Sequence, residues 1–382
     1  MSPALRIGAT GFGLIAVCYG FARFAFGLFL PQMDGSLALG PALSGVISGG
    51  AFAGYCVAIV ASAVLTERAG ARAVATGAAL VAAVGMAGIA LAPSPLVLAG
   101  AVIVAGLSTG LASPPMAAAV AAAVQRDRQD LINTVINAGT SAGVALSGPI
   151  ALAMGGQWRL AFAGFAAVAV ILGLVALRAL PGETRGGAPA GGLPPLTGPV
   201  RRLIGASFLM GAASTALWSF GGELVAQRLG WGPGGAGMLW TCIGGGGVAG
   251  AFAGGLVARF GLDRVHRVFL GLMAVGIVAV GAAMSAPGLV LAGGAAFGAA
   301  YVMLTGVYLV WGVRAVPGRP ATGLMVGFLT IAIGQTAGAP VFGVMLGAFG
   351  AGPAVLVFAG LALVAGVFRA GERSVGVAAP MG

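Results

Sequence analysis

The sequence predicts an all-α integral membrane protein with twelve transmembrane helices in two pseudo-symmetric six-helix bundles. Three observations predict it. The 382 residues are 59% hydrophobic and only 7% charged, with a mean hydropathy of +1.06, whereas soluble domains carry about a quarter charged residues. Apolar runs long enough to cross a bilayer recur along the chain. One polar stretch rich in Pro and Gly divides these runs into two equal sets.

The expected helices follow the apolar runs in chain order. Because the bilayer core offers no water to unpaired backbone groups, each run should be helical. The runs are 7–30, 41–65, 73–92, 96–124, 131–154 and 161–180, then 203–227, 236–258, 265–286, 288–313, 322–348 and 353–369. The dividing stretch, Pro181 to Arg202, cannot bury a core. We therefore expect a first bundle over 1–181, a cytoplasmic linker over 182–202 and a second bundle over 203–382.

Arginine placement predicts the orientation in the membrane. All 19 basic residues are arginine, and an N-terminus in the cytoplasm assigns sixteen of them to that side and two, Arg159 and Arg228, to the other. Positive residues concentrate in cytoplasmic loops. We therefore expect a multi-pass protein of the bacterial inner membrane with both termini in the cytoplasm.

Several functional classes are disfavoured. The net charge of +11 is spread over loops instead of forming the single basic face of a nucleic-acid binder. Three distant cysteines and one histidine, His266, support neither a disulfide framework nor a metal site. A catalytic triad pattern is lacking, and a phosphate-binding loop needs a lysine that the chain does not contain. We expect no enzyme activity, no cofactor, no metal and no nucleic-acid partner, and a monomer in the lipid bilayer.

The two halves repeat each other. The string Gly-Thr-Ser-Ala-Gly at 139–143 is echoed by Gly-Gln-Thr-Ala-Gly at 334–338, 195 residues later. Glu67-Arg68-Ala69-Gly70 is echoed by residues 258–261, 191 residues later. Two matches at nearly equal offsets indicate an internal duplication, which is typical of transporter folds.

At these positions the chain resembles the major facilitator superfamily. Its signature after the second helix is matched by Glu67, Arg68, Gly70 and Arg72, while Ala63 stands where the family has glycine. The run that ends in Gly148-Pro149 is similar to an exporter motif of the family, with its spacing stretched by one residue. Residues 20–31 and Leu229-Gly230-Trp231 are similar to the YbfB/YjiJ-like branch. The resemblance implies a secondary transporter and suggests efflux.

Arg23 is the sharpest candidate for a functional residue. A cation at the centre of a membrane helix costs about 2.5 to 3.5 kcal/mol, so its side chain should face the protein interior or a hydrated cavity. Its guanidinium suits a substrate carboxylate or another anion. The alternative is an arginine that reaches the membrane surface or forms a structural pair.

Two acidic residues are candidates for proton coupling. Glu223 is the only acid within an apolar run, and Asp34 follows the first run. The repeat offset places Glu223 near the outer membrane surface, where it could instead be hydrated or pair with Arg228. We expect Glu223 to matter less than Arg23.

The resemblance also implies which helices line the central cavity, namely the first, fourth, seventh and tenth. The candidate substrate-binding residues that follow are Tyr19, Phe26, Trp218, Tyr301, Thr305 and Tyr308, although several could serve helix packing or the interfacial aromatic belts. Asn137 joins them from a polar stripe on the fifth helix, where it could equally hydrogen-bond a neighbouring helix.

The sequence therefore predicts a secondary transporter that moves a small solute by alternating access. The leading hypothesis is a small organic anion held by Arg23. The first alternative is a proton-coupled exporter of amphipathic compounds in which Glu223 or Asp34 titrates. A signalling receptor on a transporter scaffold is a third, and no appended sensor or effector domain in the chain supports it.

Overall fold

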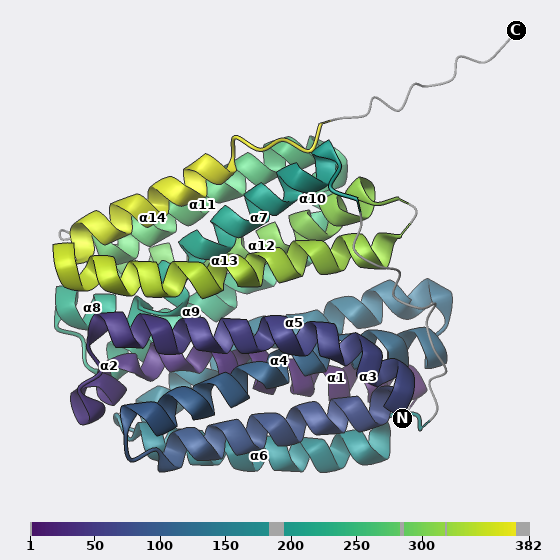
Figure 1. Cartoon of the computed structure of the whole chain (residues 1–382), viewed down its shortest axis with the longest axis horizontal. Helices are drawn as coiled ribbons and strands as arrows, with labels where there is room; N and C mark the ends of the chain where they lie inside the picture. The colour runs from purple at the N-terminus through teal and green to yellow at the C-terminus, as the bar shows by residue number, and fades with distance from the viewer. Residues whose placement is uncertain (1, 183–194, 283–285, 318, 372–382) are drawn as a thin grey trace, which may run out of the picture.

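The computed structural model describes residues 2–182, 195–282, 286–317 and 319–371. Helices in two layers make up the described chain, and no strand occurs in these ranges (Figure 1). The first layer contains α1 (Pro3–Ile15), η1 (Ala16–Phe24), α2 (Ala25–Leu37), α3 (Gly40–Leu91), α4 (Pro95–Ala123), α5 (Arg126–Ala153) and α6 (Trp158–Ala179). The second contains α7 (Gly198–Trp218), α8 (Gly221–Leu229), α9 (Pro233–Gly247), η2 (Val248–Phe252), α10 (Ala253–Phe260), α11 (Leu262–Gly281), α12 (Pro287–Ala315), α13 (Pro320–Phe349) and α14 (Ala351–Ala365).

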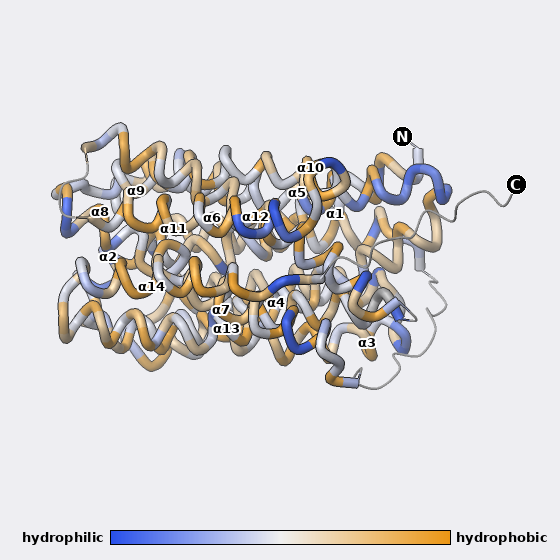
Figure 2. Tube along the Cα trace, turned by 90° about the horizontal axis from the view of Figure 1, so that it is seen from above, coloured by the Kyte–Doolittle hydropathy of each residue, from blue (hydrophilic) through white to orange (hydrophobic). Residues whose placement is uncertain are grey.

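The predicted all-helical membrane fold is confirmed. Nine helices of the described chain are long and apolar enough to span a membrane, and α7 and α8 together form a tenth span bent by 46°. One of the nine, α3, contains two spans joined at Gly70, and α14 is a shorter apolar helix. The helices are hydrophobic or neutral along most of their length (Figure 2). These elements account for the twelve predicted spans.

The internal duplication is visible in the backbone. Gly70 has φ 80° and ψ 158°, and Gly261 has φ 83° and ψ 150°. Positive φ of this kind strains a residue with a Cβ, which explains glycine at both echoed positions. The other echoed strings also pack alike: a Cβ at Gly139 would lie 2.3 Å from the Phe12 carbonyl, and one at Gly334 would lie 2.1 Å from the Phe208 carbonyl.

Three helix pairs make the largest contacts between the two layers. The first half of α3 packs against α13, α5 packs against α9, and α2 packs against α8. In the α5 and α9 pair, a Cβ at Gly148 would lie 2.3 Å from the Gly237 carbonyl, so Gly148 allows the two backbones to touch. Pro149 lies next to it within α5.

The two ends of the bundle differ in charge. One end, which we call the arginine-rich end, carries Arg68 and Arg72 and the starts of α5, α7 and α11. Arg72 ties this end together because its Nε donates a hydrogen bond to the Leu180 carbonyl at 2.8 Å. We call the other end the outer end; it contains the junctions from α2 to α3 and from α8 to α9.

The structure differs from the sequence prediction in two local respects. The second layer begins at Gly198, within the region expected to be linker, while residues 183–194 of that linker lie outside the described residues. In the first span, residues 16–24 form a π-helix between two α-helices. The wider π turn appears where Gly20 meets the backbone of Gly143, a contact that periodicity alone does not reveal.

Candidate functional site

Arg23 lies in the interior, at the contact between the two layers. It belongs to the π-helical segment η1, and only 6% of its surface is exposed. π-Helical turns are often found at functional sites. Arg23 therefore lies in the protein interior, and its role in substrate binding stays a prediction.

A hydrogen-bond network connects Arg23 to the second layer. Its Nη2 donates to Oε1 of Gln335 on α13 at 2.5 Å. The Nε2 of Gln335 donates in turn to Oγ of Ser214 on α7 at 3.1 Å and to the hydroxyl of Tyr301 on α12 at 3.2 Å. In this network, as far as the described residues form it, a neutral amide and not a carboxylate accepts the bond from the guanidinium.

Aromatic rings enclose the guanidinium. Its central carbon lies 4.6 Å from the ring centroid of Tyr55, 4.7 Å from Phe52, 5.0 Å from Phe24 and 5.8 Å from Tyr19. A cation near an aromatic face gains about 0.5 to 2 kcal/mol, with the larger values in desolvated sites. These rings help the bundle to hold a buried cation, and all four come from the first layer.

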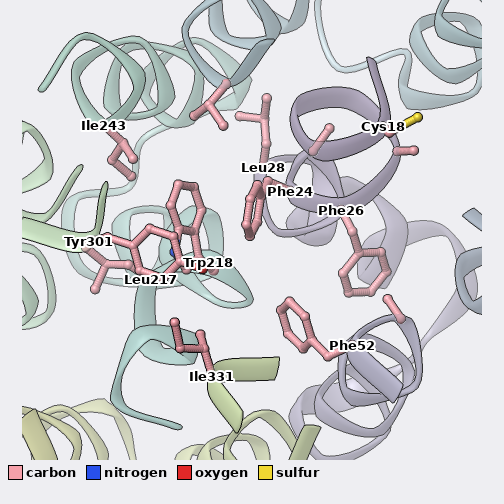
Figure 3. Close-up of a cluster of buried hydrophobic side chains, with 14 of the residues drawn as sticks. Cys18, Phe24, Phe26, Leu28, Phe52, Leu217, Trp218, Ile243, Tyr301 and Ile331 are labelled. Atoms are coloured by element: carbon pink, nitrogen blue, oxygen red, sulfur yellow. The ribbon is translucent and has the colours of Figure 1, made fainter. Parts of the chain in front are cut away.

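Side chains of the second layer complete the enclosure. The Trp218 ring stacks on Phe24 with centroids 4.0 Å apart and meets Tyr301 edge-on at 5.1 Å. In Figure 3, Phe24 and Phe52 face Trp218, Tyr301 and Ile331 across the boundary between the layers. We call Arg23, Gln335 and these surrounding aromatic residues the central cluster.

Two buried donors of the central cluster have no hydrogen-bond partner within the described residues, Arg23 Nε and Trp218 Nε1. A buried donor left unpaired costs about 1 to 3 kcal/mol. Both donors would therefore be stabilised by an acceptor oxygen in the same enclosure. The arrangement combines a fixed positive charge, a spare indole donor and aromatic walls.

The structure brings several of the predicted site residues together. Tyr19, Trp218 and Tyr301 all lie around Arg23. The hydroxyl of Tyr19 shares a hydrogen bond of 2.9 Å with Ser113 on α4, and its ring meets Tyr55 at 6.4 Å. Phe26 is buried in the same hydrophobic core (Figure 3).

Three other predicted site residues lie apart from this network. Tyr308 is buried within the second layer, where its hydroxyl contacts His266 Nε2 at 2.9 Å and the Ala206 carbonyl at 3.2 Å. Thr305 is half-buried and donates to the Val302 carbonyl of its own helix at 2.6 Å. Asn137 is exposed on α5. Their roles in substrate binding remain predictions. Their positions away from Arg23 do not favour these roles.

The two acidic candidates lie together near the outer end. Asp34 and Glu223 line one small pocket with Leu30, Gly40, Pro41, Ser44 and Phe220. Asp34 accepts a bond of 2.7 Å from the Gly40 amide. Glu223 accepts a bond of 2.7 Å from Gln227, one helical turn away, so the observed partner is Gln227 and not the suggested Arg228.

Sequence reasoning missed the residue that connects Arg23 to the second layer. Gln335 was visible only as a member of the repeated string at 334–338. One feature of the sequence could have pointed to Gln335. The corresponding position of the first half is Thr140, so the two halves of the repeat differ here, with a longer amide side chain in the second half. Phe52 and Tyr55 gave no signal, because aromatic residues in an apolar run are common.

Comparisons with known proteins agree with this architecture. The model of the Major Facilitator Superfamily matches residues 12–206, about half of the chain. No match is found among curated proteins.

Solved structures of transporters share the fold at low sequence identity. A point variant of the nucleoside transporter NupG is 14% identical with a TM-score of 0.81, covering 96% of this chain and 98% of that one. The xylose transporter XylE from E. coli is 17% identical with a TM-score of 0.74, covering 96% and 98%. The human organic anion transporter MFSD10 is 19% identical with a TM-score of 0.62, covering 96% and 100%. Together with the family match and the two-layer helical fold, this shows that the chain belongs to the major facilitator superfamily.

Proposed function

We propose that the protein is a secondary transporter that moves a small organic anion across the bacterial inner membrane, with Arg23 as the anion ligand. The observation that carries this proposal is a buried guanidinium, shared between the two layers, whose hydrogen-bond acceptor is the neutral amide of Gln335. Such a cation gains most from an anion, because charge-assisted hydrogen bonds are about twice as strong as neutral ones.

The donors and rings around Arg23 also support the chemical character of the substrate. Arg23 Nε and Trp218 Nε1 offer donors to two acceptor oxygens, while Phe24, Phe52 and Tyr301 offer apolar surface. A small carboxylate with an apolar or aromatic body fits this chemistry. Since the three similar structures carry names for a nucleoside, xylose and organic anions, the fold itself does not select the substrate.

A screen of ligands by thermal unfolding tests the proposal. Ligands that bind only the folded state raise the apparent Tm. We expect small carboxylates to raise the Tm of the purified protein and neutral sugars to leave it unchanged. If only cationic or neutral amphipathic compounds raised the Tm, the organic-anion proposal would be wrong.

A second candidate function is a proton-coupled exporter of amphipathic compounds. The observation that favours it is the shared pocket of Asp34 and Glu223, because carboxyl groups can take up and release protons on either side of a membrane. The run that ends in Gly148-Pro149 also resembles an exporter motif, with its spacing stretched by one residue.

Replacing Glu223 by glutamine separates these two candidates. We expect transport of a stabilising carboxylate, and its dependence on pH, to change less than threefold, because Glu223 lies near the outer end and outside the central network. The measurement is flux into vesicles over a range of pH, with Gln227→Leu as the control that removes the amide bonded to Glu223 and keeps the carboxyl group. Loss of both flux and pH dependence in Glu223→Gln would place the proton-coupled exporter first.

The proposed location predicts a specific topology. The arginine-rich end should face the cytoplasm, as positive residues do in membrane proteins. Reporters fused after Arg202 and after Gly382, which lies outside the described residues, should both give a cytoplasmic signal. A periplasmic signal at either site would contradict the orientation.

A further inference from the structure

A pocket separate from the central cluster lies at the arginine-rich end of the second layer. It has a volume of about 430 Å³ and is lined by Arg267, Leu270, Leu363, Gly366, Val367 and Arg369. These residues come from the start of α11 and from the end of α14 with the segment that follows it. A Cβ at Gly366 would lie 3.1 Å from the Leu363 carbonyl oxygen and would touch Arg267 Cγ at 3.5 Å and Leu270 Cδ1 at 3.6 Å, so a side chain there would take up part of the pocket.

The polar side of this pocket is positive. Arg267 and Arg369 are both exposed, and the N-terminus of α11, the positive end of its helix dipole, lies beside them. The nearby acid is Asp263, whose Oδ1 already accepts a bond of 2.7 Å from the Ala370 amide. Arg267 Nε donates to the Asp263 backbone carbonyl at 3.2 Å. Within the described residues its terminal nitrogens make no hydrogen bond, so they can reach a ligand.

The other side of the pocket opens onto apolar surface. Leu363 is 56% exposed and Val367 is 75% exposed on the α14 side. Val268 and Val275 are exposed on α11, and Leu356 and Val364 are exposed further along α14. In a membrane-spanning bundle such side chains face lipid tails. A ligand of this site thus meets two cations at the membrane surface and hydrocarbon-facing helices below it.

We propose that this pocket binds the headgroup of an anionic phospholipid, with its acyl chains along α11 and α14. Basic pockets between transmembrane helices at a membrane surface recognise acidic lipid headgroups. A free inorganic phosphate would use the two arginines but would leave the exposed leucine and valine side chains without a partner. The inference does not depend on the substrate of the central cluster.

Lipid titration of the delipidated protein in detergent tests the site. We expect dioleoyl phosphatidylglycerol to raise the Tm and to be retained in native mass spectrometry, and dioleoyl phosphatidylcholine to do neither. Each arginine beside an anionic headgroup contributes roughly a fivefold gain in affinity. The double variant Arg267→Gln/Arg369→Gln should therefore bind phosphatidylglycerol on the order of 25-fold more weakly.

A matched control variant loses the same two positive charges at positions outside the pocket. Arg126 and Arg314 are also exposed at the arginine-rich end but do not line the pocket, so Arg126→Gln/Arg314→Gln should retain phosphatidylglycerol affinity within about twofold. Equal weakening in both double variants, or an equal Tm increase with phosphatidylcholine, would overturn the proposal. An equal increase with inorganic phosphate that is lost in the pocket variant would assign the site to free phosphate instead.

Discussion

Replacing Arg23 by alanine is expected to abolish binding of any carboxylate that stabilises the wild-type protein. Truncating one partner of a buried charged pair costs about 2 to 5 kcal/mol, which corresponds to a loss of affinity of about 30-fold or more. Arg23→Lys should also weaken binding by about tenfold, because lysine keeps the charge and loses the planar fork of donors. Affinity is measured by titration of the purified variants with that carboxylate.

The control for Arg23 is Arg314→Ala, which removes an exposed arginine from the same chain. It should bind the carboxylate with wild-type affinity. Because Arg23 is buried among aromatic rings, each variant must first show a cooperative thermal transition. Wild-type affinity in folded Arg23→Ala and Arg23→Lys would make Arg23 a structural residue and remove the main support for an organic-anion transporter.

Replacing Gln335 by leucine is expected to loosen the contact between the two layers. The substitution keeps a similar volume but removes the acceptor of Arg23 and the donors to Ser214 and Tyr301. A hydrogen bond to a charged group contributes about 1.5 to 3 kcal/mol. The protein should exchange between an arrangement with the two layers in contact at Arg23 and one with them apart there. The equilibrium constant between these arrangements should therefore shift by tenfold or more toward the separated one.

The native Cys56 reports this opening, since it is half-buried on α3 and packs against the small cluster that Tyr55 and Ile59 form with Ala332 of α13. In a Cys18→Ala/Cys242→Ala background, the rate of Cys56 modification by N-ethylmaleimide should rise in Gln335→Leu. Gln157→Leu, at an exposed glutamine before α6, is the control and should leave the rate unchanged. An unchanged rate in Gln335→Leu would show that this bridge does not hold the layers together.

The fold was predictable because its determinants are local. Span length, apolar composition and arginine placement follow directly from the bilayer as solvent, and the paired turns at Gly70 and Gly261 were visible as a sequence repeat. The π-helix at residues 16–24 was not predictable, because it depends on the contact between Gly20 and Gly143 of another helix.

The candidate site was predictable only in part, for a physical reason. Placing a charged side chain within a membrane helix costs free energy, so a lone arginine in an apolar run needs a functional or structural reason. Arg23 was recognisable for that reason. A glutamine such as Gln335 is much less costly, and its importance comes only from the neighbours that the fold supplies. Tyr308 shows the opposite error: its aromatic ring and helix suggested the cavity, whereas its place about two turns beyond Tyr301 along the same face of α12 puts it beside His266.

Between the central cluster and the outer end, α2 touches the turn from α7 to α8 by direct contact of backbones. A Cβ at Gly27 would lie 2.1 Å from the Trp218 carbonyl, and one at Gly222 would lie 2.5 Å from the Gly27 carbonyl. A water molecule needs a cavity of its own volume and polar partners, and two backbones in van der Waals contact leave neither. Between Gly27 and Trp218 there is thus no room for a file of water, so water or a solute could pass between α2 and α7 at this point only after the two helices separate.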